Sequence, residues 1–530
     1  QVSETSFKGD VFLRPNDTME HRSDRLACLD GVRGILCVVV VIHHFFCGFW
    51  PCLVFGSSTE WLSDLEACPE NYESMLWWAS FFSPLYNGKF AVVVFFVLSG
   101  MVLSYRLLQE TAKQRPESSP WLQAWALAVV KRFFRLGVPY AAASLFSFAL
   151  GGSSSNEEAA RVTMSHWLGV YAPRRPFFLG LLQQMLWGTL LQGSTLNNAL
   201  WSMKLELFGS MLVFMLVAVI IGSGNKEKVR RRVILFALFL CFGSSGMLRS
   251  DIRADILWGG GNMSVPFSLK WQKRLQNKTM RFEFQQSSRH QTIVEPKPPL
   301  LIDQVTKPKL LMGELAQQSE KDLSVSLNGG DGWGNNAPAF WYAPFVVGVA
   351  LGCTCQQPCF LQARSWWACI GATVVCASYP FIVDGTRLDQ ISWVFRMMSF
   401  ISNFLMLGTM GDVLWYTLGA ASLIRAILAS PSLQQALVAP PVLWLGRVSF
   451  GLYLTHIPIL YSFTCELFLY ALKAGWDYSM AVLLACGLSS LAMFLVAALF
   501  SSYVDQPAVK WSAIAGRWLL GLEQSSCGVQ

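Results

Sequence analysis

Long apolar segments separated by shorter polar ones run through most of this 530-residue sequence. A helix that crosses a membrane needs about 20 mostly apolar residues. Ten segments approach or exceed that length, namely residues 34–54, 86–105, 137–151, 199–222, 233–249, 341–356, 366–383, 397–424, 443–464 and 481–503. The pattern predicts an all-α, polytopic membrane protein of about ten transmembrane helices.

Basic residues at the ends of the apolar segments indicate how the chain crosses the membrane. Lys131, Arg132 and Arg135 lie at the start of the third segment, and residues 226–232 between the fourth and fifth hold five lysines and arginines. Both clusters lie on the cytosolic side if the N-terminus does, in agreement with the positive-inside rule. We therefore expect a cytosolic N-terminus.

Two segments leave this topology open. Residues 177–192 are apolar but short and contain two glutamines, so we expect them to lie in the membrane interface or to re-enter rather than to span. Residues 397–424 have Asp412 near their centre. They form either one spanning helix or two short helices, and the second arrangement would reverse the orientation of the rest of the chain.

A polar, proline-containing stretch of mixed charge, residues 251–340, interrupts the apolar pattern. Its composition is typical of a long, partly disordered loop, which the topology places in the lumen, although translated intron sequence is an alternative. Asn262 and Asn277 begin N-glycosylation sequons on that side. The expected domains are a cytosolic segment, a membrane domain interrupted by this loop, and a cytosolic tail, at residues 1–28, 29–507 and 508–530.

The composition also favours a membrane protein, with 53% hydrophobic and 14% charged residues against about 25% charged in soluble domains. The net charge of +8 does not indicate nucleic-acid binding, because the basic residues lie at segment ends rather than along one face. No short apolar run with a small-residue cleavage site precedes the first segment. We expect the first helix to direct insertion, into the endoplasmic reticulum or another endomembrane.

Most of the 14 cysteines lie singly in apolar segments, where a buried thiol is usual. Cys353, Cys355 and Cys359 form the one cluster, and no second ligand pair at zinc spacing accompanies it, so we expect no metal site. Cys52 and Cys68 share a predicted lumenal loop and are candidates for a disulfide bond.

Arg33 and His44 are the most informative polar residues of the first apolar segment. Eleven helical steps of about 100° come to about three full turns, so both side chains lie on one helix face, about 16 Å apart. This spacing predicts a cation at the membrane surface and an imidazole near mid-bilayer. Ionisable groups inside a spanning helix favour a functional site over a histidine that merely bonds to a neighbouring helix.

Few other polar residues lie within apolar segments. Glu206 must find a partner or stay protonated, and Lys204 is not at a spacing that lets the two side chains face each other. His456 precedes Pro458, where a histidine often caps carbonyls that the proline frees. Arg132 and Arg135 lie three residues apart on one helix face, and with Arg33 they would bind phosphates or simply anchor the topology.

Six motifs give the chain a resemblance to the acyltransferase-3 family of multi-pass membrane acyltransferases, and specifically to its fungal members. Arg33 and His44 match the family's R-x10-H spacing after a D-G-x-R start, and Ser99 belongs to a segment similar to F-F-x-L-S-G. The other motifs are Arg132 to Arg135 with Pro139, Trp201 to Glu206, Phe450 to His456, and Asp505 to Pro507. Met203, Lys204 and Asp505 depart from the usual residues.

The resemblance implies acyl transfer, usually of acetyl, from cytosolic acyl-CoA as co-substrate to a hydroxyl of an acceptor, with no permanently bound cofactor. Arg33, Arg132 and Arg135 would bind the CoA phosphates. His44 would act as general base, Glu206 would orient it or the acceptor, and His43 would support it. Fungal relatives act on glycans, lipids and secondary metabolites, and we expect a small secondary metabolite here. The sequence does not indicate an oligomeric state.

Two other functions fit parts of the pattern. A proton-coupled transporter would use the intramembrane His and Glu as a proton relay, but the two halves show no repeat symmetry. A catalytically inactive, receptor-like relative would keep the helices and lose the ligands, whereas this chain keeps them.

Overall fold

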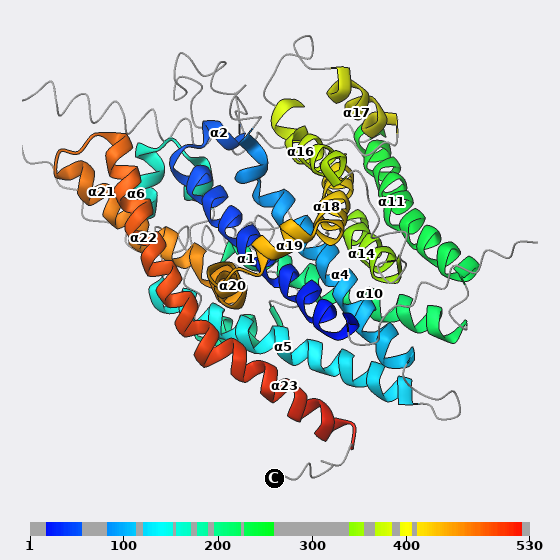
Figure 1. Ribbon diagram of the computed structural model, residues 1–530. Helices are drawn as coiled ribbons and strands as arrows, with labels where there is room; N and C mark the ends of the chain where they lie inside the picture. The colour runs from blue at the N-terminus through cyan, green and yellow to red at the C-terminus, as the bar shows by residue number, and fades with distance from the viewer. Residues whose placement is uncertain are drawn as a thin grey trace, which may run out of the picture.

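The computed structural model describes residues 17–55, 82–112, 120–151, 155–170, 178–188, 196–223, 227–258, 339–354, 366–383, 393–404 and 411–521. All elements in this part of the chain are helices. Seven of its helical stretches are long and apolar enough to cross a membrane. The predicted all-α, polytopic fold is therefore confirmed (Figure 1).

A helix occupies each of the ten predicted segments. The seven candidate spans contain α1 (Asp17–Phe49), α4 (Gly88–Ala112), α5 (Pro120–Leu150), α10 (Trp201–Gly222), α18 (Gly411–Ala429), α20 (Pro440–Ile459) and α22 (Tyr478–Phe500). The other three segments contain α11 (Glu227–Trp258), α14 (Ala343–Thr354) and α16 (Trp366–Val383). Short helices α2 (Cys52–Phe55), α6 (Ser155–Val162), α7 (His166–Val170), α19 (Pro431–Leu437) and α21 (Cys465–Lys473) cover the ends of these long ones.

Helices α1 and α20 pack side by side through Gly34, near the middle of α1, and Gly446, in the first half of α20. A Cβ added to Gly34 would lie 2.5 Å from the backbone nitrogen of Gly446, and one added to Gly446 would collide with the Asp30 carbonyl oxygen. Small residues permit such close backbone approach between membrane helices. Further along both helices, Cys37 contacts the Ser449 carbonyl and His44 contacts His456, so the two helices run parallel.

Helices α4 and α14 form a second close pair. Gly100 and Gly348 leave no room for a side chain, because a Cβ on either would overlap the backbone of the opposite helix. Helix α4 begins beside the end of α1, where Gly88 contacts His43, so it runs antiparallel to α1. These contacts place α4, α1 and α20 in the same part of the helix bundle.

Each of the two open segments contains two helices rather than one. Residues 178–188 form two short helices, α8 (Phe178–Gln183) and the π-helix η3 (Gln184–Gly188), too short to cross a membrane. Within 397–424 the chain forms α17 (Trp393–Phe404) and α18, and only α18 is long enough to span. Asp412 is the second residue of α18 and lies 3.8 Å from Lys89, so it is at the start of the spanning helix rather than inside one long helix.

The chain around the predicted loop and tail is more helical than the composition indicates. Helix α11 continues to Trp258, inside the stretch 251–340, and most of that stretch, with Asn262 and Asn277, lies outside the described residues. Cys52 is disulfide-bonded, and its expected partner Cys68 also lies outside them. The tail begins with α23 (Gln506–Leu519), which runs along α5 (Figure 1) with Gly516 against Leu127.

Candidate active site

Arg33 and His44 lie on α1, but the helix begins earlier than the apolar segment predicts. Its candidate span is Ala27–Phe49. Arg33 is therefore inside the span, and His44 lies five residues before the end of α1. The sequence predicts His44 near mid-bilayer, whereas it lies nearer the C-terminal end of this candidate span. Their separation along the helix remains about 16 Å.

His44 meets His456 of α20. The His44 Nδ1 and the His456 Nε2 are 3.0 Å apart, and the His456 Nδ1 lies 3.1 Å from the Leu452 carbonyl oxygen. His456 is fully buried, whereas His44 is half-buried. The parallel packing of α1 and α20 thus brings together two histidines that are 412 residues apart.

Trp167 covers one face of the His44 imidazole, and Tyr461 stacks on the far side of Trp167. Trp167 stacks on His44 with ring centroids 5.4 Å apart, and Tyr461 stacks on Trp167 at 5.5 Å. Trp167 belongs to α7, which is tied to α1 because the Ser165 hydroxyl donates to the Cys47 carbonyl at 2.7 Å. Neither aromatic ring was predicted to lie near His44, and Trp167 comes from a short helix outside the apolar segments.

Another residue, Asn197, bonds to the carbonyl that Pro458 leaves without an N–H donor in α20. Pro458 has no N–H to donate to the Leu454 carbonyl four residues earlier. The Asn197 side chain donates to that carbonyl at 2.8 Å, and its Oδ1 accepts from the Ala199 N–H at 3.0 Å. His456 is therefore not the residue that caps the freed carbonyl.

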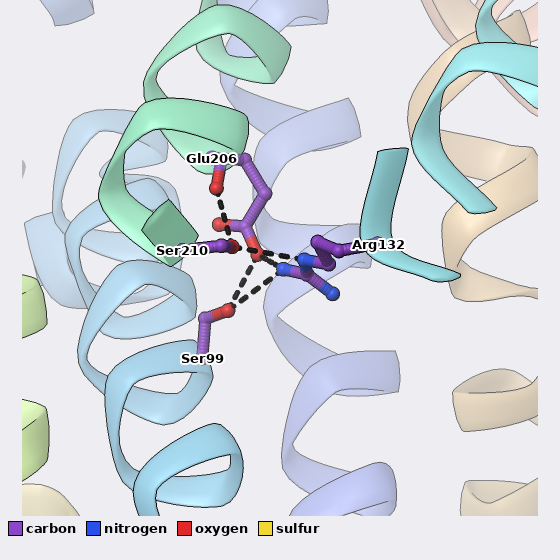
Figure 2. A network of polar contacts seen from close by, with 4 residues as sticks. All are labelled: Ser99, Arg132, Glu206 and Ser210. Atoms are coloured by element: carbon purple, nitrogen blue, oxygen red, sulfur yellow. Dashed lines mark hydrogen bonds and ion pairs between the residues drawn. The ribbon is translucent and has the colours of Figure 1, made fainter. Parts of the chain in front are cut away.

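A second polar centre joins α4, α5 and α10 (Figure 2). Arg132 forms an ion pair with Glu206, and the two side chains are only 12% and 17% exposed. The Ser99 hydroxyl donates to Glu206 Oε1 at 2.5 Å and accepts from Arg132 Nη2 at 2.9 Å. Arg132 Nε donates to the Ser210 hydroxyl at 2.8 Å, which in turn donates to the Glu206 carbonyl at 2.6 Å.

This network determines the partner of the Glu206 carboxylate. Sequence left open whether Lys204 pairs with it, and the structure assigns Arg132 instead. Within the part of the chain that the structure describes, no hydrogen bond joins Glu206 to His44. Ser210 was not predicted, although its position one helical turn after Glu206 would have indicated it.

Arginines gather next to this network. Arg135 interacts electrostatically with Arg33, Arg132 and Arg106, and with Asp505 as an opposite charge. Arg33 also lies 3.5 Å from Asp30, and both side chains are partly exposed. Sequence predicted three members of the cluster and missed the exposed Arg106, because it belongs to no motif.

His43 lies beside His44, with ring centroids 5.4 Å apart, but its hydrogen bond goes to another partner. Its Nδ1 lies 3.0 Å from the Tyr86 carbonyl oxygen, and its ring packs against Gly88 at the start of α4. These contacts join α1 to α4. Among the described residues, no group of three or more His, Cys, Asp or Glu side chains is placed to hold a metal ion.

A histidine pair and an arginine cluster inside a bundle of apolar helices define a polytopic membrane protein with a polar site within its spans. Residues 26–269 match the family model of the acyltransferase 3 family, described as an acyltransferase domain. Residues 26–269 of this chain are therefore similar to an acyltransferase domain of that family. The match includes Arg33, His44 and Glu206 and ends before His456. No curated protein and no solved structure matches the chain.

Proposed function

We propose that the protein transfers an acyl group, by family resemblance acetyl, from acyl-CoA to a hydroxyl of an acceptor, with His44 as the general base. The observation that carries the proposal is the half-buried imidazole of His44, held by His456 through one ring nitrogen and stacked on Trp167, within a domain that matches acyltransferases. A general base needs a fixed orientation and one nitrogen open to the reacting hydroxyl.

The arginine cluster supports binding of the donor from the side that the sequence predicts to be cytosolic. Arg33, Arg106 and Arg135 lie close enough to interact and together favour an anion such as the CoA phosphates. Arg132 would hold the cluster in place, since its own guanidinium is engaged by Glu206. The distance of about 16 Å from Arg33 to His44 along α1 suits the extended pantetheine arm.

The chemistry needs no group beyond these residues and the two substrates. His44 takes the proton of the acceptor hydroxyl while the oxygen forms a bond to the thioester carbonyl carbon. The carbon–sulfur bond then breaks, and the proton passes to the departing CoA thiolate. The products are the acylated acceptor and free CoA, with His44 returned to its neutral form.

The acceptor is a small molecule of secondary metabolism in our proposal, with lipids and glycans as the other candidates. Endomembrane location, glycosylation at Asn262 and Asn277, and fungal-type membership stay predictions from the sequence. The partners are thus acyl-CoA, the acceptor and the lipid bilayer. A proton-coupled transporter is less well supported, because Glu206 bonds to Arg132 and Ser99 rather than to a histidine.

The test is acyl transfer by the purified protein in lipid nanodiscs. Acetyl-CoA labelled in its acetyl group is added with extracts of the source organism, and labelled products are identified by mass spectrometry. We expect one acceptor class to gain a label and CoA thiol to appear in equal amount. A proton flux across proteoliposomes without thioester consumption would instead support the transporter. Metabolites that lose one acyl group in a deletion strain would identify the acceptor.

A further inference from the structure

The hydrogen bonds of His456 determine which of its ring nitrogens carries hydrogen. Its Nδ1 lies 3.1 Å from the Leu452 carbonyl oxygen, and a carbonyl oxygen can only accept. The Nδ1 must therefore carry the hydrogen. A neutral imidazole has one N–H, so the Nε2 of His456 has a lone pair and accepts.

The tautomer of His456 also determines the tautomer of His44. Its Nδ1 lies 3.0 Å from the His456 Nε2, which has no hydrogen to give, so the His44 Nδ1 must be the donor. The His44 Nε2 then has the lone pair, on the side of the ring away from His456.

We propose that His456 is a positioning residue, which holds His44 as its Nδ1–H tautomer and so presents the His44 Nε2 lone pair to the acceptor hydroxyl. The tautomer stands on geometry alone, whereas its use in acyl transfer rests on the proposed function. His456 is an unusual orienting partner because it is uncharged, whereas catalytic histidines are often oriented by a carboxylate.

The surroundings suit this role at both ends of the proton transfer. When His44 takes a proton on Nε2, its Nδ1–H continues to donate to His456, so the hydrogen bond persists through the step. The indole of Trp167, stacked at 5.4 Å, favours the positive charge that forms on the imidazole. Complete burial of His456 excludes water that would compete for either of its nitrogens.

Kinetics of three variants on α20 separate positioning from packing. His456→Leu removes the acceptor, and we expect kcat to fall about 10- to 100-fold with the KM for acyl-CoA unchanged. His456→Gln keeps an oxygen that accepts and an N–H that donates, so it restores most of kcat. Thr455→Val is the matched control, because the buried Thr455 hydroxyl donates to the Gly451 carbonyl of its own helix and, among the described residues, to no group of the site. Equal losses in all three variants would overturn the proposal.

Nitrogen NMR of protein labelled in its histidine rings tests the tautomer without any activity. The six histidines are assigned by single substitutions. We expect His44 to show a protonated Nδ1 and a bare Nε2, and His456 the same pattern, with the Thr455→Val protein unchanged. A protonated Nε2 on His44 would overturn the proposal. If the tautomer is found but His44→Ala still transfers acyl groups, the proposed function fails while the assignment of the hydrogen bond stands.

Discussion

The His44–His456 pair and the Arg132–Glu206 pair lie in one helix bundle, but only the histidine pair joins uncharged partners. Removing one member of a desolvated ion pair leaves a charge without compensation, which costs about 3–5 kcal/mol. Removing one hydrogen bond between neutral groups costs about 1 kcal/mol. The comparison teaches that the charged centre contributes mainly to assembly of α4, α5 and α10, whereas the neutral one is suited to move a proton.

The two centres also differ in how far they extend along the chain. Ser99, Arg132 and Glu206 all lie within the region that matches the acyltransferase family model, whereas the histidine pair joins that region to α20 beyond it. The family match alone therefore contains a complete ion-pair network but only one of the two histidines. We infer that the later helices complete the site rather than form a separate unit.

The largest effect should come from the neutral centre. His44→Ala should lower the rate of acyl transfer by about 10²- to 10⁴-fold, since it removes the proposed general base. The midpoint of thermal unfolding should change little, because His44 is only half-buried. Transfer of labelled acetyl in nanodiscs and a thermal-shift assay measure the two quantities. A His44→Ala variant with a much lower unfolding midpoint but unchanged specific activity would contradict this assignment, because His44 would then contribute to stability and not to catalysis.

Glu206→Ala should have the next largest effect, and it should lower the free energy of unfolding. It strands the guanidinium of Arg132, and we expect a loss of about 3–5 kcal/mol in the free energy of unfolding. The double variant Arg132→Met/Glu206→Leu removes both charges and should regain most of that stability. Unfolding in mixed micelles measures the difference. A double variant less stable than Glu206→Ala would show that the ion pair itself stabilises the bundle.

Arg135→Gln and Arg106→Gln should each raise the KM for acyl-CoA about tenfold with a small change in kcat. Each removes one of the charges that would face the phosphates. Arg517→Gln is the matched control, because Arg517 lies in the last turn of α23 and not in the cluster. Saturation curves for acyl-CoA measure the effect. An unchanged KM would assign both arginines to topology alone.

The smallest effect is expected from Ser210→Ala. It removes one acceptor of Arg132 and leaves the Glu206 ion pair, so the loss in stability should be about 1 kcal/mol, with activity retained. The same unfolding assay measures it. A loss as large as that of Glu206→Ala would mean that the network acts as a unit rather than as separate bonds.

Hydrophobic length was enough to predict the helices, since every predicted apolar segment is helical. The shared face of Arg33 and His44 follows from helical periodicity in the same way. The partners could not be predicted, because Glu206 and Arg132 are 74 residues apart and His44 and His456 are 412 apart. Such pairs depend on which helices pack together, and single-sequence periodicity carries no information on helix neighbours.

The shorter helices were harder to predict from the sequence, for a different reason. Residues 397–424 have enough apolar residues for one long helix, yet the chain forms α17 and α18 as separate elements. The Ser402 hydroxyl, which accepts from the Trp415 indole at 2.9 Å, joins those two helices across the break. Trp167 likewise stacks on His44 from the short helix α7, which the Ser165 hydroxyl joins to α1 outside any periodic pattern.

The glycine contacts of α1 with α20 have a consequence for the alignment of the imidazoles. A helix advances about 1.5 Å and turns about 100° with each residue. A slip of one residue between Gly34 and Gly446 would therefore swing His456 out of reach of His44 rather than lengthen their hydrogen bond slightly. The Gly34–Gly446 contact therefore sets the register of α1 against α20 in steps of one residue. Residues about 15 Å from the histidines thus determine whether the pair exists at all.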